Sequence, residues 1–170
     1  LTTALRAAGA TQPVSIGDGA WGVEMTGADN GFRVRQLTPY IDFHGPHVYR
    51  METDAVRQHL GAAFVCELLG GALGAGKPVV MEEFGVTSDY VSEENAAHYY
   101  RQVLHTTLLA GATGWIPWNN TDYDALADQE PYSHHPFEMH FGLTDFAGRP
   151  KEQHLGESFD LAELLLGPAR

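Results

Sequence analysis

Two adjacent glutamates at the end of a short apolar segment could place a carboxylate in an active site. The segment from Lys77 to Gly85 reads KPVVMEEFG, in which apolar residues precede Glu82, Glu83, an aromatic ring and a glycine. A continuous apolar run of this kind is typical of a fully buried parallel strand. Because α/β folds collect catalytic groups at the carboxyl ends of such strands, an acid group here is a candidate for chemistry.

The two glutamates are expected to point in different directions, because side chains alternate between the faces of a strand. If one carboxylate enters an active-site mouth, the other leans toward the surrounding helices or caps the strand end. A simpler alternative is that Glu82 and Glu83 are both solvated residues at a strand terminus. The segment alone does not decide between these two interpretations.

Strands and helices are expected to alternate along the chain and so to position these carboxylates. Predicted strands are Pro13–Ile16, Asp42–Tyr49, Pro78–Met81 and Gly114–Trp118, and predicted helices are Leu1–Ala8, Phe32–Leu37, Asp54–Leu73, a segment from Ser92 to Gly111, and Lys151–Leu166. Thr53 is a suitable N-cap for the predicted helix Asp54–Leu73, and Ser92 is a suitable N-cap for the helix that it begins. Such alternation predicts a parallel sheet with helical crossovers.

Each long helix has a predicted apolar face. In the first, Val56, Leu60, Phe64 and Leu68 recur every four residues, and in the second the inner face is Tyr100, Val103, Leu104, Thr107 and Leu108. Cys66, the single cysteine, is expected to pack inside a helix as a small apolar residue, and a lone cysteine excludes an internal disulfide.

The predicted fold class is α/β, as about half of an eight-stranded (β/α) barrel. Four strand–helix pairs account for 170 residues, whereas a whole barrel takes about 250. The first predicted helix also begins without a cap, so we expect residues 1–170 to be one partial domain cut from a longer chain. The exposed edges of such a half-barrel would favour self-association or pairing with a complementary half.

Composition excludes some classes of protein. The chain has 22 acidic and 10 basic residues and a formal net charge of -12, so nucleic acid is not an expected partner. No apolar run reaches the roughly 18 residues of a membrane span. His134, His135 and His140 lack a familiar zinc spacing, and the glycines of 70–76 lack a following Lys-Ser/Thr, so we expect neither a metal nor another cofactor.

An ordered set of motifs resembles the glycoside hydrolases of clan A, in particular the cellulase and mannanase family 5. KPVVMEEFGV resembles the seventh barrel strand, HVY from His47 to Tyr49 the sixth, and GWIPWNN the eighth. GLTDFAGRPKE, which starts at Gly142, is similar to the tail after the last strand. The match spans residues 12–152, and it implies that the chain is the C-terminal half of the catalytic barrel, strands five to eight.

The resemblance also implies a retaining mechanism on β-linked mannosides or glucosides. Glu83 would be the nucleophile, Tyr49 would donate a hydrogen bond that favours its ionised form, and His47 would line the sugar site. Trp118 would be the platform for the sugar ring. Asn119, Asn120 and Asp122, in the polar loop of residues 119–140, are predicted to bind sugar hydroxyls. Each aromatic or histidine side chain could instead be an ordinary core residue.

One residue of the family pattern has no counterpart here. The acid/base glutamate belongs to an Asn-Glu pair at the end of the fourth strand, and the chain contains no such pair. We therefore expect this chain alone to be inactive or impaired, with an oligosaccharide or polysaccharide as substrate of the complete enzyme. The alternative is a catalytically incompetent carbohydrate-binding fragment. The loop of residues 119–140 favours exo-acting β-mannosidases, and for the compartment the cytoplasm is slightly favoured over secretion.

Overall fold

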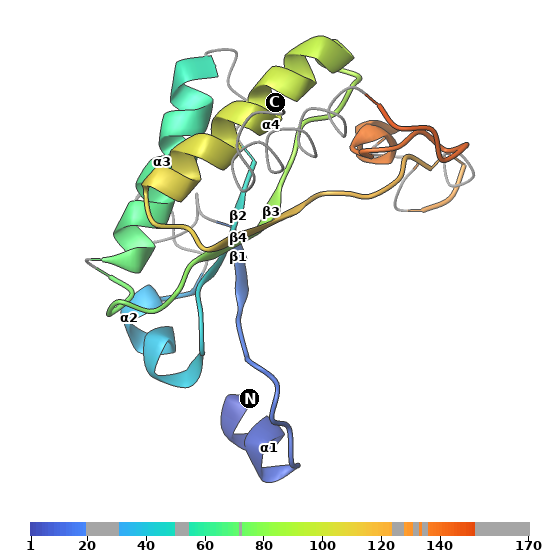
Figure 1. Ribbon diagram of the computed structural model, residues 1–170. Helices are drawn as coiled ribbons and strands as arrows, with labels where there is room; N and C mark the ends of the chain where they lie inside the picture. Colours follow the sequence, from blue (N-terminus) through green and yellow to red (C-terminus); the bar gives the residue numbers. More distant parts are fainter. Residues whose placement is uncertain are drawn as a thin grey trace, which may run out of the picture. The chain divides into compact units, whose positions relative to one another are not determined.

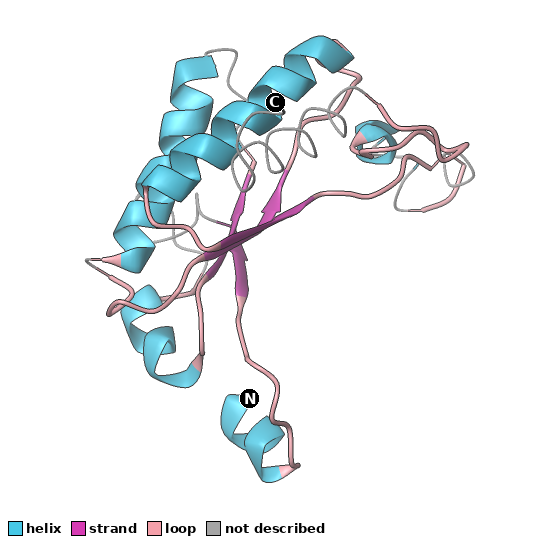
Figure 2. Cartoon of the chain, viewed as in Figure 1, coloured by secondary structure: helices cyan, strands magenta, loops and turns pink. Residues whose placement is uncertain are grey.

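The computed structural model describes residues 1–19, 31–49, 55–71, 73–123, 128–130, 133 and 136–151. Their chain order alternates strands and helices, as the sequence predicts (Figures 1 and 2). The chain divides into two compact units. The first contains residues 1–84 and 106–116, and the second contains residues 85–105 and 117–170. Within the described residues, no helix is long and apolar enough to cross a membrane.

The first unit is built on a sheet whose strand order is β1-β2-β3-β4. The strands are β1 (Gly17–Gly19), β2 (Gly45–Val48), β3 (Val80–Phe84) and β4 (Gly114–Pro117). β1 pairs with β2 in parallel, and β2 pairs with β3 in parallel. Val79, Met81 and Phe84 are fully buried, because the apolar part of β3 lies at the centre of this sheet. The parallel arrangement therefore brings the carboxyl ends of β2 and β3 together.

β1 differs from the prediction of a strand at Pro13–Ile16. The strand lies just beyond the predicted one, at Gly17–Gly19. The reason is tertiary: a Cβ atom on Gly17 would lie 2.5 Å from His47 Nε2, so only glycine allows the imidazole to lie over β1. Glycine is a poor strand former by propensity, and here the close approach of a side chain overrides that preference.

Short helices precede β1 and connect β1 to β2 along the chain. Helix α1 (Thr2–Ala7) is fastened by Arg6, whose guanidinium donates to Asp42 Oδ2 at 2.6 Å. The backbone N–H of Val14 donates to the same carboxylate oxygen. Helix α2 (Val34–Leu37) confirms the prediction of a helical turn between Phe32 and Leu37, and it continues into the 3-10 helix η2 (Thr38–Tyr40).

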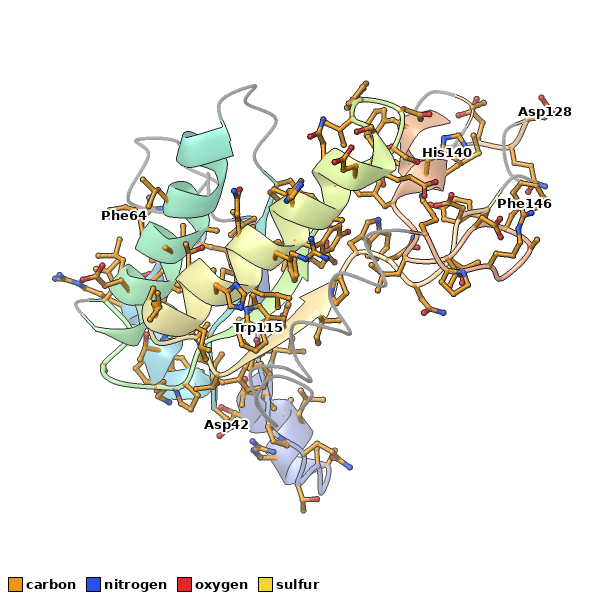
Figure 3. All side chains as sticks on the ribbon, turned by 45° about the horizontal axis from the view of Figure 1, so that its top comes forward. Asp42, Phe64, Trp115, Asp128, His140 and Phe146 are labelled. Carbon is orange, nitrogen blue, oxygen red and sulfur yellow. The ribbon has the colours of Figure 1, made fainter. Side chains whose placement is uncertain are left out.

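Helix α3 (Ala55–Gly70) forms as predicted, but with a different buried face. Leu60 and Phe64 are 53% and 56% exposed, and Figure 3 shows Phe64 directed away from the sheet. Among the side chains of α3 that the structure describes, residues 60–70, the buried ones are Ala62, Val65, Cys66 and Leu69. A repeat of four residues drifts by about 40° per step on a helix of 3.6 residues per turn, so the predicted stripe leaves the core face. Thr53, the predicted cap, lies outside the described residues.

Helix α4 (Glu93–Leu109) confirms its predicted cap and most of its inner face. Ser92 Oγ accepts a hydrogen bond from the backbone N–H of Asn95, and Glu93 and Glu94 lie in the first turn. Both features stabilise a helix N-terminus. Tyr100, Val103, Leu104 and Thr107 are buried, whereas Leu108 is exposed. The predicted helix at Lys151–Leu166 lies outside the described residues, except for Lys151 itself.

The second unit contains the loop that follows β4 and the 3-10 helix η4 (Pro136–His140). Thr121 forms a parallel bridge with Thr144, and Thr144 an antiparallel bridge with Pro150. His140, labelled in Figure 3, faces Asp89 with Nδ1 at 2.8 Å from each carboxylate oxygen. The Thr121–Thr144 bridge joins the loop after β4 to the segment of residues 139–151, and the His140–Asp89 contact joins that segment to the loop between β3 and α4.

Candidate active site

Glu83 and Tyr49 meet where β2 and β3 end. The Tyr49 hydroxyl donates a hydrogen bond to Glu83 Oε2 at 2.8 Å, so the expected contact between these two residues is present. The parallel pairing of His47 with Glu83 and of Val48 with Phe84 produces this proximity, because Tyr49 follows β2 directly. A phenol that donates to one carboxylate oxygen fixes the direction in which the other oxygen points.

His47 lies beside the same carboxylate. Its Nδ1 is 3.4 Å from Glu83 Oε2, and its Nε2 is 3.7 Å from Glu82 Oε2. Among the described residues, both partners of the Glu83 carboxylate therefore contact Oε2. The other oxygen, Oε1, is the one available to a ligand. The Glu83 side chain is 29% exposed, so a reactant can reach it from solvent.

Glu82 departs from the prediction that it leans toward the helices or caps the strand end. Its carboxylate lies over Gly45 of β2 and faces the same imidazole as Glu83. Two β2–β3 pairs explain this: His44 pairs with Val79, and His47 pairs with Glu83. Three steps along β2 thus match four steps along β3, so β3 carries one extra residue. Such a bulge breaks the strict alternation of side chains, and it redirects Glu82.

Trp118, Asn119 and Asn120 belong to the second unit. The Trp118 side chain is 36% exposed, and the Trp118–Asn119 peptide bond is cis. Asn119 Oδ1 accepts a hydrogen bond from the backbone N–H of Thr121 at 3.1 Å, and Asn120 Nδ2 donates to Thr121 Oγ1 at 3.2 Å. The two amides thus shape the loop through local contacts and still carry further donors and acceptors.

Asp122 is buried, with only 9% of its side chain exposed. Lys151 Nζ donates to both carboxylate oxygens at 3.1 and 3.0 Å, and the backbone N–H of Gly142 donates to Oδ1 at 2.7 Å. Lys151 also donates to Ser88 Oγ and to the carbonyl of His140. The predicted sugar ligand is therefore engaged in a buried ion pair that joins three segments of the second unit.

Some predicted or weighed residues cannot be placed. His134 and His135, which were considered as metal ligands, lie outside the described residues. Among the residues that are described, no group of three His, Cys, Asp or Glu side chains could hold a metal ion. Sequence reasoning missed the contact of Glu82 with His47, because it depends on a strand register that no local pattern reveals. The only sequence signal was the presence of glycine at positions 17 and 45.

Comparison with known proteins gives this site a context. No protein-family model matches the chain. The probable mannan endo-1,4-β-mannosidase A of Aspergillus oryzae is 30% identical over 112 residues, a match that covers 60% of this chain and 28% of the relative. The structure of the exo-β-1,4-mannosidase Op5Man5 from an Opitutaceae bacterium aligns over 75% of this chain and 23% of that one, with 26% identity and a TM-score of 0.58.

A third similar protein is a GH5_18 enzyme from Bifidobacterium longum subsp. longum, solved in complex with Manb1-4GlcNAc. It aligns over 92% of this chain and 37% of its own, with a TM-score of 0.67, and its 21% identity shows a shared fold. The chain thus spans only between 23% and 37% of these structures, and 28% of the curated relative.

Fold and site together define a class. Parallel strands joined by helices, with the structural likenesses above, fit part of a (β/α) barrel of the glycoside hydrolase kind. Within that class the chain is similar to part of the family 5 enzymes of clan A, as the mannosidase relatives indicate. The resemblance carried by the motifs is confirmed at this level.

Proposed function

We propose that this chain is part of a retaining β-glycosidase in which Glu83 is the nucleophile. The observation that supports this most is the hydrogen bond from Tyr49 to Glu83 Oε2 at the end of β3, together with the absence of any contact of Oε1 with another described residue. In the first step Glu83 Oε1 attacks the anomeric carbon, a carbon–oxygen ester bond forms, and the glycosidic bond breaks. In the second step water cleaves the ester and restores the carboxylate.

The leaving oxygen needs a proton in the first step, and we propose that its donor is not in this chain. A retaining enzyme needs a second carboxyl group about 5–5.5 Å from the nucleophile. Glu82 is a poor candidate, because its carboxylate lies over Gly45, two residues before His47 on β2, and so deeper along the strands than Glu83. We therefore assign the acid/base role to a carboxyl group supplied by the rest of the barrel.

The sugar class follows from the relatives. Both the Aspergillus oryzae protein and Op5Man5 are named as β-1,4-mannosidases, so we propose a β-linked mannoside as the substrate, with a β-glucoside as the second choice. Trp118, with Asn119 and Asn120, is proposed to bind the sugar, and His47 to line the site. Asp122 is left out of this set, because Lys151 and Gly142 already occupy its carboxylate.

We also propose that residues 1–170 form the C-terminal half of the barrel, strands five to eight. β1 and β4 are the outer strands of the described sheet, and such edges pair readily with another chain. Association with a complementary half, or with a second copy, would cover them. Light scattering tests this expectation, and a monodisperse monomer would contradict it.

Hydrolysis of two kinds of mannoside tests the function. An aryl β-mannoside with a good leaving group hardly needs an acid, whereas an unactivated β-1,4-linked mannobiose does. We expect the 170-residue chain to cleave the aryl mannoside slowly and to leave the disaccharide intact. Equal and rapid cleavage of both substrates would refute the proposal that the acid is missing from this chain. Binding of the sugar without any cleavage, both in the wild type and in Glu83→Gln, would favour a carbohydrate-binding fragment instead.

A further inference from the structure

The extra residue in β3 has turned a second carboxylate toward the site. In a regular strand Glu82 would lie on the opposite face from Glu83. The register shift between the pairs His44–Val79 and His47–Glu83 places both carboxylates against one imidazole. Bulges often redirect a side chain beside an active site, and this one does so for a residue that precedes the proposed nucleophile.

Two glycines make room for this arrangement. A Cβ atom on Gly45 would collide with the Glu82 carboxyl group, and it would lie 2.5 Å from Ser15 Oγ. A Cβ atom on Gly17 would lie 2.5 Å from His47 Nε2 and 3.5 Å from Glu82 Oε2. Gly17 and Gly45 are paired across β1 and β2, so the space is a single cradle built across two strands. Side chains at these positions would expel either the carboxylate or the imidazole.

A buried serine hydroxyl lies beside the cradle. The Ser15 Oγ atom has no hydrogen-bond partner among the residues that the structure describes, and it lies close to Glu82. An orphaned hydroxyl of this kind is uncommon, because leaving it unpaired costs free energy. A small movement of the Glu82 carboxylate would let the Ser15 hydroxyl donate a hydrogen bond to it, so the cradle offers Glu82 a hydroxyl on one side and an imidazole on the other.

We propose that Glu82 is a positioning residue that holds the His47 ring against Glu83. His47 has one nitrogen toward each carboxylate, so the ring bridges the two. An imidazole between the Glu82 and Glu83 carboxylates keeps these two anions apart. Without it they would repel each other, and their side chains would turn away from each other. When Glu83 becomes an ester its charge is lost, and the contact of His47 Nε2 with Glu82 Oε2 remains to keep the ring in place. The part of this role that concerns the reaction rests on the proposed function.

Three variants separate positioning from general structure. Glu82→Gln keeps the shape and removes the charge, while Gly45→Ala keeps Glu82 and displaces its carboxyl group. Glu94→Gln, in the exposed first turn of α4, is the matched control for loss of one carboxylate. In the 170-residue chain we expect both cradle variants, but not the control, to change the ¹⁵N shifts of the His47 ring and so its tautomer.

The reaction gives the second readout. A 2-deoxy-2-fluoro-mannosyl fluoride carries its own good leaving group, so it forms the ester on Glu83 without an acid. We expect Glu82→Gln to slow this labelling by roughly tenfold to a hundredfold, the size of effect that a misplaced group causes, and to alter its pH profile. His47, Glu82, Glu83 and Tyr49 are the titratable groups that face one another there.

Each result has a definite meaning. Unchanged His47 shifts in both cradle variants would overturn the positioning role. If the cradle variants do not fold, the wild-type chain still decides: the ¹³C shift of the Glu82 carboxyl must move when His47 titrates, and an independent response would overturn the proposal. If the wild type is never labelled, the proposed nucleophile is wrong, whereas the His47 shifts still decide whether Glu82 holds the ring.

Discussion

Glu83 and Asp122 show two opposite uses of a carboxylate in one chain. Glu83 is 29% exposed, its Oε2 accepts from a phenol, and its Oε1 has no partner among the described residues. Asp122 is 9% exposed, and a lysine ammonium and a backbone N–H bind its carboxylate. The Glu83 carboxylate is oriented through one oxygen and keeps the other available, whereas both oxygens of the Asp122 carboxylate are bound by groups of the same chain.

The difference shows why residue type alone does not identify a site. Glu83 lies near the carboxyl end of β3 and Asp122 in the loop after β4, so a sequence pattern treats both as acid groups beyond a buried strand. The partner decides: a buried cation makes a carboxylate structural, whereas a neutral donor on one oxygen prepares it for attack. The predictions below try to reverse or to sharpen this contrast, beginning with the largest expected effect.

Removing the charge at each position should separate the two roles by activity. In an enzyme that includes this chain and its complementary barrel segment, we expect Glu83→Gln to lower the hydrolysis rate by roughly 10⁴-fold or more, because it removes the nucleophile. Asp122→Asn should cost far less activity per folded molecule. Initial rates on an aryl β-mannoside check this, and similar rates for Glu83→Gln and wild type would contradict it.

Stability should show the reverse order. Asp122→Ala leaves Lys151 buried without its anion, and breaking a buried pair in this way typically costs about 3–5 kcal/mol. Glu83→Ala should have a small effect, since its side chain is partly solvated. Urea unfolding followed by circular dichroism measures both. The double variant Asp122→Ala, Lys151→Met should recover much of the loss, and no recovery would show that the pair is not the cause.

Tyr49→Phe tests how Glu83 is held. The change removes one hydroxyl that donates to Oε2 and leaves the ring, so the lost interaction is a hydrogen bond to a charged group, worth about 1.5–3 kcal/mol. We expect a fall of roughly 10- to 100-fold in the labelling rate of Glu83, with little change in unfolding. Tyr90→Phe, far along the chain in the second unit, is the control. Equal labelling in all three proteins would remove Tyr49 from the site.

The smallest predicted effect is a pH dependence of stability that arises from the burial of His44. Burial lowers the pKa of His44 from its ordinary value of 6.5, although its hydrogen bond with the Gly74 carbonyl opposes the shift. The unfolded chain therefore takes up a proton at a higher pH than the folded one. Stability present above pH 6.5 should decrease as the pH falls below that value.

Urea unfolding at pH 7 and pH 5.5 measures this dependence. In His44→Gln, which has no titratable group at this position, the difference between the two pH values should be smaller than in the wild type. The free energy of unfolding that the wild type loses between pH 7 and pH 5.5 should also be smaller than the loss caused by Asp122→Ala. An identical pH dependence in both proteins would show that other groups control it.

The helices and their order were predictable, because local signals define them. Ser92 caps α4 as expected, and Cys66 is buried, which raises the pKa of its thiol to about 12. The buried face of α3 was predicted wrongly at Leu60 and Phe64, because a strict four-residue spacing was taken as one face. Element type was therefore recoverable from local sequence, while the buried face needed the exact helical period.

The site was only half accessible to sequence reasoning. The Tyr49–Glu83 contact was expected from the resemblance of two motifs to those of the glycoside hydrolases, and the structure places these motifs at the ends of neighbouring parallel strands. The cradle of Gly17 and Gly45 and the position of Glu82 depend on the extra residue in β3, which appears only when the strands are paired. Likewise, the ion pair of Asp122 with Lys151 joins residues 29 positions apart, and no motif links them.

Mass spectrometry of the chain after reaction with 2-deoxy-2-fluoro-mannosyl fluoride tests the central assignment most directly. The reagent needs no acid, so the absence of the acid/base glutamate from this chain does not prevent the reaction. The account predicts one added fluoromannosyl group on the peptide that contains Glu83, absent in Glu83→Gln and retained in Asp122→Asn. A label on any other residue, or no label on a folded wild-type chain, would contradict the assignment of Glu83 as the nucleophile.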